Sequence, residues 1–328
     1  MPERDKPKNI ILIIGSGLGL THLSTISYYS SQPLILEQFS VTGLQTPHTF
    51  NNLVADPIAS TSAIASGEKN LKGDIGLQEI KKRNSILTLA KQAGYATGLI
   101  TTSSFDHPLP VCFLGNTDLQ TVQQPSHLLV LSGLDLFIGG GAKTFGSTID
   151  KNVVNAKQFQ LDDYSEKFIP DVNKQAILFT SPDTPLKASK GRKYLPKATK
   201  YAANYLSQKS EAGFFLVVLS TQINDSALTG DVNQLTAELQ DYNQTVEAAL
   251  NFANMDKETL VITTSDVESG GLAINPGSEP DSLLLVFNNS SHTGTFLPIF
   301  ATGPGAERFS GIYDNTDIFF KIKSALGF

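Results

Sequence analysis

NIILIIG, residues 9–15, is the stretch that decides the fold. Residues 10–14 are all isoleucine or leucine, which predicts a short strand, and the lack of polar alternation predicts burial on both faces. The glycine-rich GSGLG that follows predicts a tight turn into a helical stretch ending near Tyr29. This strand-turn-helix unit is typical of α/β proteins with a parallel sheet.

Further apolar runs of the same kind recur along the chain and alternate with helical patterns. Strands are predicted over residues 96–102, 134–141 and 214–219, and helices over 84–94, Tyr194–Ser207 and 235–254. We therefore expect one α/β domain over residues 1–328, with a mostly parallel central sheet and helices on both faces. The polar, poorly periodic segment 141–192 is predicted to be an insertion over this sheet that carries one strand, residues 176–180.

Composition narrows the classes of partner. The 328 residues carry a net charge of −6 without a cluster of lysine and arginine, which argues against a nucleic-acid surface or an anionic membrane as the main partner. No run approaches the roughly 20 apolar residues of a membrane span. The single cysteine, Cys112, excludes an internal disulfide and a thiolate zinc site. The amino-terminal MPERDKPK lacks the apolar core of a secretory signal, so localisation stays unknown, and a periplasmic or extracellular home would imply a trimmed signal.

The glycines after the first strand invite comparison with a dinucleotide-binding turn. Gly15, Gly17 and Gly19 do not fit the spacing G-x-G-x-x-G, because residue 20 is leucine. Nicotinamide binding is therefore disfavoured.

A second informative stretch is VADPIASTSAIASG, residues 54–67. Asp56 is a favourable N-cap, Pro57 suits the first helical position, and the small residues that follow can pack closely against a sheet. The stretch therefore predicts a buried helix that begins at Pro57.

These motifs, taken in order, resemble those of the alkaline phosphatase family. The likeness covers nearly the whole chain and is weakest between about residues 146 and 192. It is most specific in the segment from His292 onward, HTGTFLPIFATGPGAERFSGIYDNTDIFFKI, which follows the family almost position for position. The other matching positions are Asp56, Ala59, Ala63, Ala65, Gly67, Thr101, Thr102, His107, Pro110, the glycines at 139–141, Asp266, Glu268, Gly270 and Gly271.

The resemblance implies hydrolysis of phosphate monoesters by a serine nucleophile, two zinc ions, one magnesium ion and a phosphate-binding arginine. The nucleophile position is Pro57 and, on an ungapped count, the arginine position is Gln120. Proline has no hydroxyl to activate, and glutamine lacks the charge of the guanidinium. The positions of the metal ligands are likewise changed, at Ser16, Leu109, Leu219, Asn224, Leu228 and Val267.

Two hypotheses remain. In the first, the chain is a catalytically inactive, alkaline-phosphatase-like protein whose pocket is lost or binds an unknown ligand or protein; no metal cofactor is then expected. In the second, it is a phosphoric monoester hydrolase with a reduced, one-metal site formed by Asp266, His292 and either His107 or Asp225, using zinc or magnesium. Dimers occur in the family, so a homodimer is an open alternative. The remnants of the pocket are assigned to Ser16, Asp56, Pro57, His107, Asp266 and His292.

Overall fold

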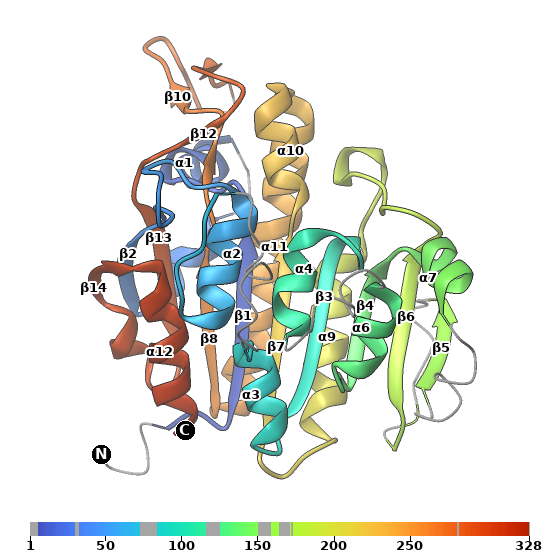
Figure 1. Ribbon diagram of the computed structural model, residues 1–328. Coiled ribbons are helices and arrows are strands. Elements are labelled where there is room, and N and C mark those ends of the chain that lie inside the picture. Colours follow the sequence, from blue (N-terminus) through green and yellow to red (C-terminus); the bar gives the residue numbers. More distant parts are fainter. Residues whose placement is uncertain are drawn as a thin grey trace.

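The computed structural model describes residues 6–29, 33–72, 84–115, 125–149, 159–163, 171, 173–280 and 282–327. Their centre is a ten-stranded sheet in which only β13 runs antiparallel to its neighbours, so the predicted mostly parallel α/β fold is confirmed (Figure 1). From one edge to the other, the strands are β14 (Gly311–Asp314), β2 (Val41–Thr46), β13 (Leu297–Thr302), β8 (Thr259–Thr264), β1 (Asn9–Gly15), β7 (Phe214–Ser220), β3 (Ala96–Ser104), β4 (Leu136–Gly140), β6 (Gln175–Ser181) and β5 (Phe159–Asp163).

Helices cover both faces of this sheet (Figure 1). One face carries α2 (Pro57–Ser66), α3 (Ile86–Gln92), α4 (Pro108–Leu114), α6 (Pro125–Leu131), α7 (Ala142–Thr148) and α12 (Asn315–Leu326). The other carries α1 (Leu20–Tyr29), α9 (Tyr194–Ser207), α10 (Gln222–Thr229) and α11 (Val232–Asp256). None of the helices in the described part of the chain combines the length and the apolar character that crossing a bilayer requires.

The central strand β1 explains why the sequence contains the run at residues 9–15. Ile10, Leu12 and Ile14 pack into the core under α2 and α12, whereas Ile11 and Ile13 pack into the core under α11. All five side chains are fully buried. Burying such a side chain contributes roughly 1.5–3 kcal/mol. The hydrophobic cores on both faces of the sheet therefore depend on this one strand.

The described part of the segment 141–192 contributes to a face of the sheet and to its end. Helix α7 covers one face, β6 pairs in parallel with β4, and β5 pairs in parallel with β6. The single predicted strand lies within β6 (Gln175–Ser181). The second strand, β5, has a polar sequence (FQLDD) without the apolar run that identifies the central strands.

Two pairs of short antiparallel strands lie at the carboxyl edge of the parallel strands. β9 (Glu268–Ser269) pairs with β12 (His292–Thr293), and β10 (Leu272–Ile274) pairs with β11 (Leu285–Phe287). They form the upper part of Figure 1 together with the end of α10. Short 3-10 helices complete the described chain at Ile35–Gln38, Ala188–Lys190 and Ala306–Phe309.

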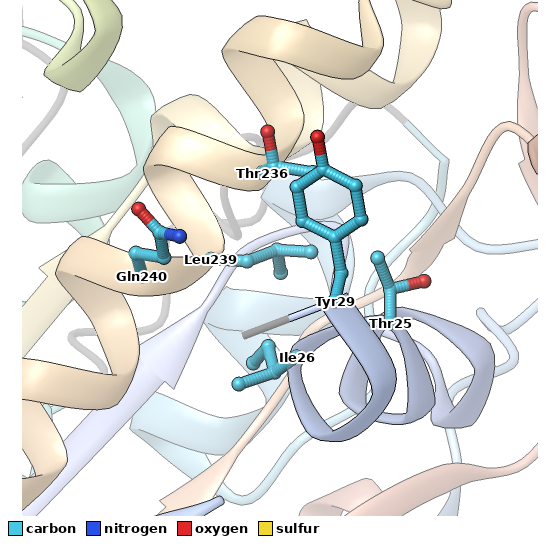
Figure 2. A pocket seen from close by; sticks show the side chains of 6 residues that line it. All are labelled: Thr25, Ile26, Tyr29, Thr236, Leu239 and Gln240. Carbon is cyan, nitrogen blue, oxygen red and sulfur yellow. The ribbon is translucent and has the colours of Figure 1, made fainter. Parts of the chain in front are cut away.

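Helix α1 packs against α11 with little space between them. Figure 2 shows Tyr29 of α1 beside Thr236 and Leu239 of α11. The gap that these residues line has a volume of about 10 Å³, which is room for about one water molecule. This contact therefore belongs to the packing of the helix layer and is too small for a ligand.

Candidate functional site

A pocket of about 380 Å³ lies at the carboxyl edge of the central strands. Open α/β sheets bind ligands at this edge because the loops that follow parallel strands converge there. Ser16 follows β1 and Thr221 follows β7, and both line the pocket. Its lining residues are Ser16, Asp56, Pro57, Ile58, Lys72, His107, Pro108, Leu109, Thr221, Asn224, Asp225 and His292. The structure thus brings together five of the six residues assigned to the pocket from the sequence, and the sixth, Asp266, lies beneath it.

Helix α2 begins at the pocket with the geometry that the sequence predicts. Asp56 is the N-cap, and its Oδ1 accepts hydrogen bonds from the backbone N–H groups of Ile58 and Ala59, each at 3.0 Å. Pro57 occupies the first helical position, and Gly67 ends the helix in the left-handed conformation, with φ of 74°. The capping prediction is confirmed.

Asp266 forms a fully buried floor beneath the pocket. Its Oδ2 accepts from the hydroxyls of Ser16 at 2.8 Å and Thr61 at 3.1 Å. Its Oδ1 accepts from the backbone N–H groups of Gly17 at 3.2 Å and Val267 at 2.7 Å. Burial raises the pKa of Asp266 to about 6, although these four hydrogen bonds act in the opposite direction. Both carboxylate oxygens are therefore engaged inside the protein.

The turn between β1 and α1 explains one of the glycines that the sequence leaves ambiguous. Gly17 has φ of 91°, and a Cβ atom there would lie 2.7 Å from Cα of Asn224. Glycine is thus required for the backbone conformation and for the close approach of α10.

His107 stands at the start of α4, a helix whose first turn contains two prolines. Its Nδ1 accepts a hydrogen bond from the backbone N–H of Leu109 at 3.3 Å, which caps the helix. Pro108 and Pro110 fall in the first turn, where the missing N–H groups would have no partner within the helix, so they do not break it. Burial lowers the pKa of His107, and the carboxylates of Asp225 and Asp106 oppose this shift.

Residues 222–229 form helix α10, which follows β7 and borders the pocket. Asn224 and Leu228 are four residues apart and share a face of this helix, while Asp225 is exposed. The Oδ1 atom of Asn224 accepts from the hydroxyl of Ser269 at 2.7 Å and lies 3.1 Å from Nε2 of His292. Burial lowers the pKa of His292, and the carboxylate of Asp56 opposes this shift.

The sequence and the fold of this chain are similar to those of known proteins. The family model described as alkaline phosphatase matches residues 7–284. The chain belongs to the alkaline phosphatase family. Alkaline phosphatase 3 of Bacillus subtilis (strain 168) is 26% identical, covering 99% of this chain and 90% of the relative. The alkaline phosphatase of Escherichia coli (strain K12) is also 26% identical, covering 98% of this chain and 87% of the relative. Among solved structures, that of alkaline phosphatase from the Antarctic bacterium TAB5 aligns with a TM-score of 0.87 at 29% identity and covers 99% of both chains.

In this alkaline phosphatase family member, several positions that the sequence resemblance assigns to changed metal ligands are apolar and packed. Leu219 in β7 and Val267 after β8 are fully buried, and Leu109 in α4 is 3% exposed. Such side chains contribute to the core and offer no atom to a cation. Gln120, at the expected arginine position, lies outside the described residues.

The donor set does not fit the metal cluster that the family resemblance implies. Within the residues that the structure describes, no three histidine, cysteine, aspartate or glutamate side chains come together closely enough to hold a metal ion. A zinc ion takes about three or four protein ligands. Asp266 makes four internal hydrogen bonds, and Nε2 of His292 is directed at an amide oxygen.

Sequence reasoning missed some of the lining residues. Thr221 could have been found, because it lies two residues beyond the predicted central strand 214–219, at the strand end where ligands of parallel sheets bind. In the structure its Oγ1 lies 3.1 Å from that of Thr102 in β3. Lys72 and Ile58 carry no such signal. A lysine in a loop and an isoleucine in the first turn of a helix have the same local sequence pattern whether or not a pocket is nearby.

A larger hollow, of about 680 Å³, lies on the outer side of α9 and α11. Lys197, Lys200, Glu247, Asn251 and Met255 line it. It lies away from the carboxyl edge of the strands, and most of its polar side chains are long and flexible ones on helix surfaces. The smaller pocket at the strand ends is therefore the candidate site.

Proposed function

We propose that this chain is a member of the alkaline phosphatase family that does not hydrolyse phosphate esters and uses its pocket to bind a ligand. One observation carries the proposal: the first residue of α2, where the family resemblance places the nucleophilic serine, is Pro57. Proline supplies neither a hydroxyl to attack phosphorus nor an N–H to hold a phosphate oxygen.

The surroundings of Pro57 support the same proposal. The next two backbone N–H groups of α2 are used by the Asp56 carboxylate. A phosphoryl group at this helix end would therefore meet a carboxylate and would lack the donors that usually stabilise its developing charge. A pocket of about 380 Å³ is nevertheless present, and volumes of about 300–1,000 Å³ are usual for small-molecule sites.

The alternative is a hydrolase with a reduced, one-metal site. The observation in its favour is that His107, Asp225 and His292 all line the same pocket, and its relatives are named as phosphatases. Asp266, which the sequence hypothesis also included, does not line the pocket. We place this alternative second because no described set of three such ligands converges.

Two measurements distinguish these functions. The purified chain is incubated with an activated aryl phosphate at alkaline pH, with zinc and magnesium added, and its metal content is determined after dialysis. We expect no turnover above the background and no stoichiometric metal. Turnover that a chelator abolishes, and that His292→Ala removes while His48→Ala does not, would overturn the proposal and establish the one-metal hydrolase. His48 is the matched control because it lies outside the pocket and its side chain is 44% exposed.

A further inference from the structure

The start of α2 does not offer this pocket the free backbone N–H groups that usually bind an anion. Phosphate binds at a helix N-terminus through backbone N–H groups that have no other partner. At α2, Pro57 has no N–H, and Asp56 Oδ1 already accepts from both Ile58 and Ala59. Among the described residues that line the pocket, Asp56 and Asp225 carry carboxylates, and Lys72 is the one lysine. A dianion would therefore meet net repulsion.

His107 presents a hydrogen-bond donor to this pocket. A backbone N–H can only donate, so Nδ1 of His107 must be the unprotonated nitrogen where it accepts from Leu109. The hydrogen of the neutral imidazole then resides on Nε2. Because the imidazole lines the pocket, this N–H group is the donor available to a ligand.

His292 offers a hydrogen-bond acceptor, whereas His107 offers a donor. The amide of Asn224 is oriented by two contacts, since its Oδ1 accepts from Ser269 and its Nδ2 is directed at the carboxylate of Asp225 at 3.5 Å. Nε2 of His292 must therefore donate to Oδ1 of Asn224, 3.1 Å away. In the neutral imidazole, Nδ1 then carries the lone pair and acts as an acceptor.

The remaining walls are largely apolar. Pro57, Ile58, Pro108 and Leu109 line the pocket beside the two imidazoles. Such a surface suits the C–H face of a sugar or a cyclic polyol. A hydroxyl group both donates and accepts, so neighbouring hydroxyls can satisfy a histidine donor and a histidine acceptor at once. The phosphoryl group of a monoester dianion has no O–H and cannot donate to the acceptor, and inorganic phosphate at neutral pH offers such a donor only together with its negative charge.

We propose that the pocket binds an uncharged, polyhydroxylated small molecule, a sugar or cyclic polyol, between His107 and His292 and discriminates against phosphate. This inference rests on the proposed non-catalytic function and names the class of ligand that the same site takes. In this site the neutral imidazole of His107 donates a hydrogen bond to the ligand, and the neutral imidazole of His292 accepts one.

Binding is measured on the full chain by isothermal titration calorimetry and by saturation-transfer NMR. The probes are methyl glucoside, myo-inositol and glycerol, with inorganic phosphate as the anionic comparison. We expect at least one uncharged probe to bind about tenfold or more tightly than phosphate, in the millimolar range typical of ligands with few anchoring groups.

Variants locate the binding. His107→Ser keeps a helix-capping side chain but removes the ring donor, and His292→Phe keeps the ring shape but removes the acceptor. Each should weaken the best probe about five- to tenfold, which corresponds to the loss of one hydrogen bond. Asp231→Ser is the matched control, because Asp231 caps α11 outside the pocket. It should bind like the native chain.

Three results would overturn the inference: no binding of any uncharged probe, tighter binding of phosphate, or unchanged affinity in folded His107→Ser and His292→Phe. Circular dichroism melts establish that the variants are folded. The hydrolysis assay tests the non-catalytic function independently of ligand binding. If the chain neither binds the uncharged probes nor hydrolyses the aryl phosphate, the inference about the ligand is wrong and the non-catalytic function stands. If the chain hydrolyses the aryl phosphate, the non-catalytic function itself is wrong.

Discussion

Two regions of this molecule bury acidic side chains, and they do so in opposite ways. Beside α11, Arg192 contacts Glu238 at 2.6 Å and Asp241 at 2.7 Å, with side-chain exposures of 1%, 0% and 6%. Beneath the pocket, Asp266 is equally buried but receives only neutral donors, namely two hydroxyls and two backbone N–H groups. The first region compensates charge with charge, and the second compensates it with hydrogen bonds alone.

The difference shows which region tolerates a change of charge. A buried ion pair depends on both partners, because removal of one leaves the other unpaired in a medium of low polarity. A carboxylate held only by neutral donors can take up a proton and lose its desolvation penalty. We therefore expect the Arg192 cluster to be fragile towards substitution, and the floor of the pocket to respond mainly to pH.

The largest effect is expected for Arg192→Met. It leaves Glu238 and Asp241 buried without a cation, and losses of about 3–5 kcal/mol are usual when one partner of a buried pair is removed. Urea denaturation measures the free energy of unfolding. Lys174→Ala is the control, since Lys174 lies 4.0 Å from Asp171 and is 50% exposed. A surface pair of this kind contributes about 0–1 kcal/mol. Similar losses in both variants would contradict the comparison.

The next effect is a pH dependence of stability to which two buried groups contribute, Asp266 beneath the pocket and His22 in α1. Burial raises the pKa of Asp266 from 3.8 to about 6, so this group stabilises the fold increasingly as pH falls through 6 towards 3.8. Burial lowers the pKa of His22 from 6.5 to about 4, so its contribution is fully present above pH 6.5 and is lost as pH falls to 4. Each shift corresponds to about 3 kcal/mol. Their effects therefore largely cancel in the native chain.

Single substitutions should separate these two contributions. Relative to the native chain, Asp266→Asn should lose about 3 kcal/mol between neutral pH and about pH 4, because only the His22 effect remains. His22→Asn should change in the opposite direction by a similar amount. Denaturation series across this pH range test both variants together. Stability curves parallel to that of the native chain would show that neither group titrates as its burial implies.

A smaller effect is expected at the N-cap of α2. Asp56→Ala removes the acceptor of two backbone N–H groups and should lower the free energy of unfolding by about 0.5–2 kcal/mol. Asp56→Asn, which keeps an oxygen acceptor, is the matched control and should stay close to the native value. Unchanged denaturation midpoints for Asp56→Ala would show that these hydrogen bonds do not contribute as a helix cap.

The sequence could predict those parts of the structure that depend on local signals. The strand Asn9–Gly15 and the helix Tyr194–Ser207 have the predicted bounds, because apolar runs, helical periodicity and end signals are local properties. The N-cap at Asp56 was predictable for the same reason. The edge strand β5 was missed because an edge position demands little of the sequence.

The candidate site depends on contacts between distant residues. The pairing of His292 with Asn224, and of Asp266 with Ser16, joins positions far apart in the chain. No local pattern specifies them, so the sequence could name the residues but not their partners.

The smallest effect is expected for Pro57→Ser, which restores a hydroxyl at the position where the family resemblance places the nucleophile. Stability should fall by only about 0.4–1 kcal/mol, because proline restricts the unfolded chain and fits the first position of α2 without strain. Turnover of an aryl phosphate should not rise. The serine hydroxyl would face a pocket in which Asp56 still uses the N–H groups of Ile58 and Ala59, and groups that act as a unit return almost nothing when one is replaced alone.

The control for that substitution is Pro57→Ala, which makes the same change in the backbone without supplying a hydroxyl. Both variants and the native chain are assayed with zinc and magnesium present, before and after a chelator. If Pro57→Ser alone gained chelator-sensitive turnover, the pocket would retain more of the machinery of a phosphatase than its side chains indicate. Equal inactivity in all three proteins means that the missing hydroxyl is only one of several losses, because a serine without an activating group keeps its high intrinsic pKa and attacks slowly.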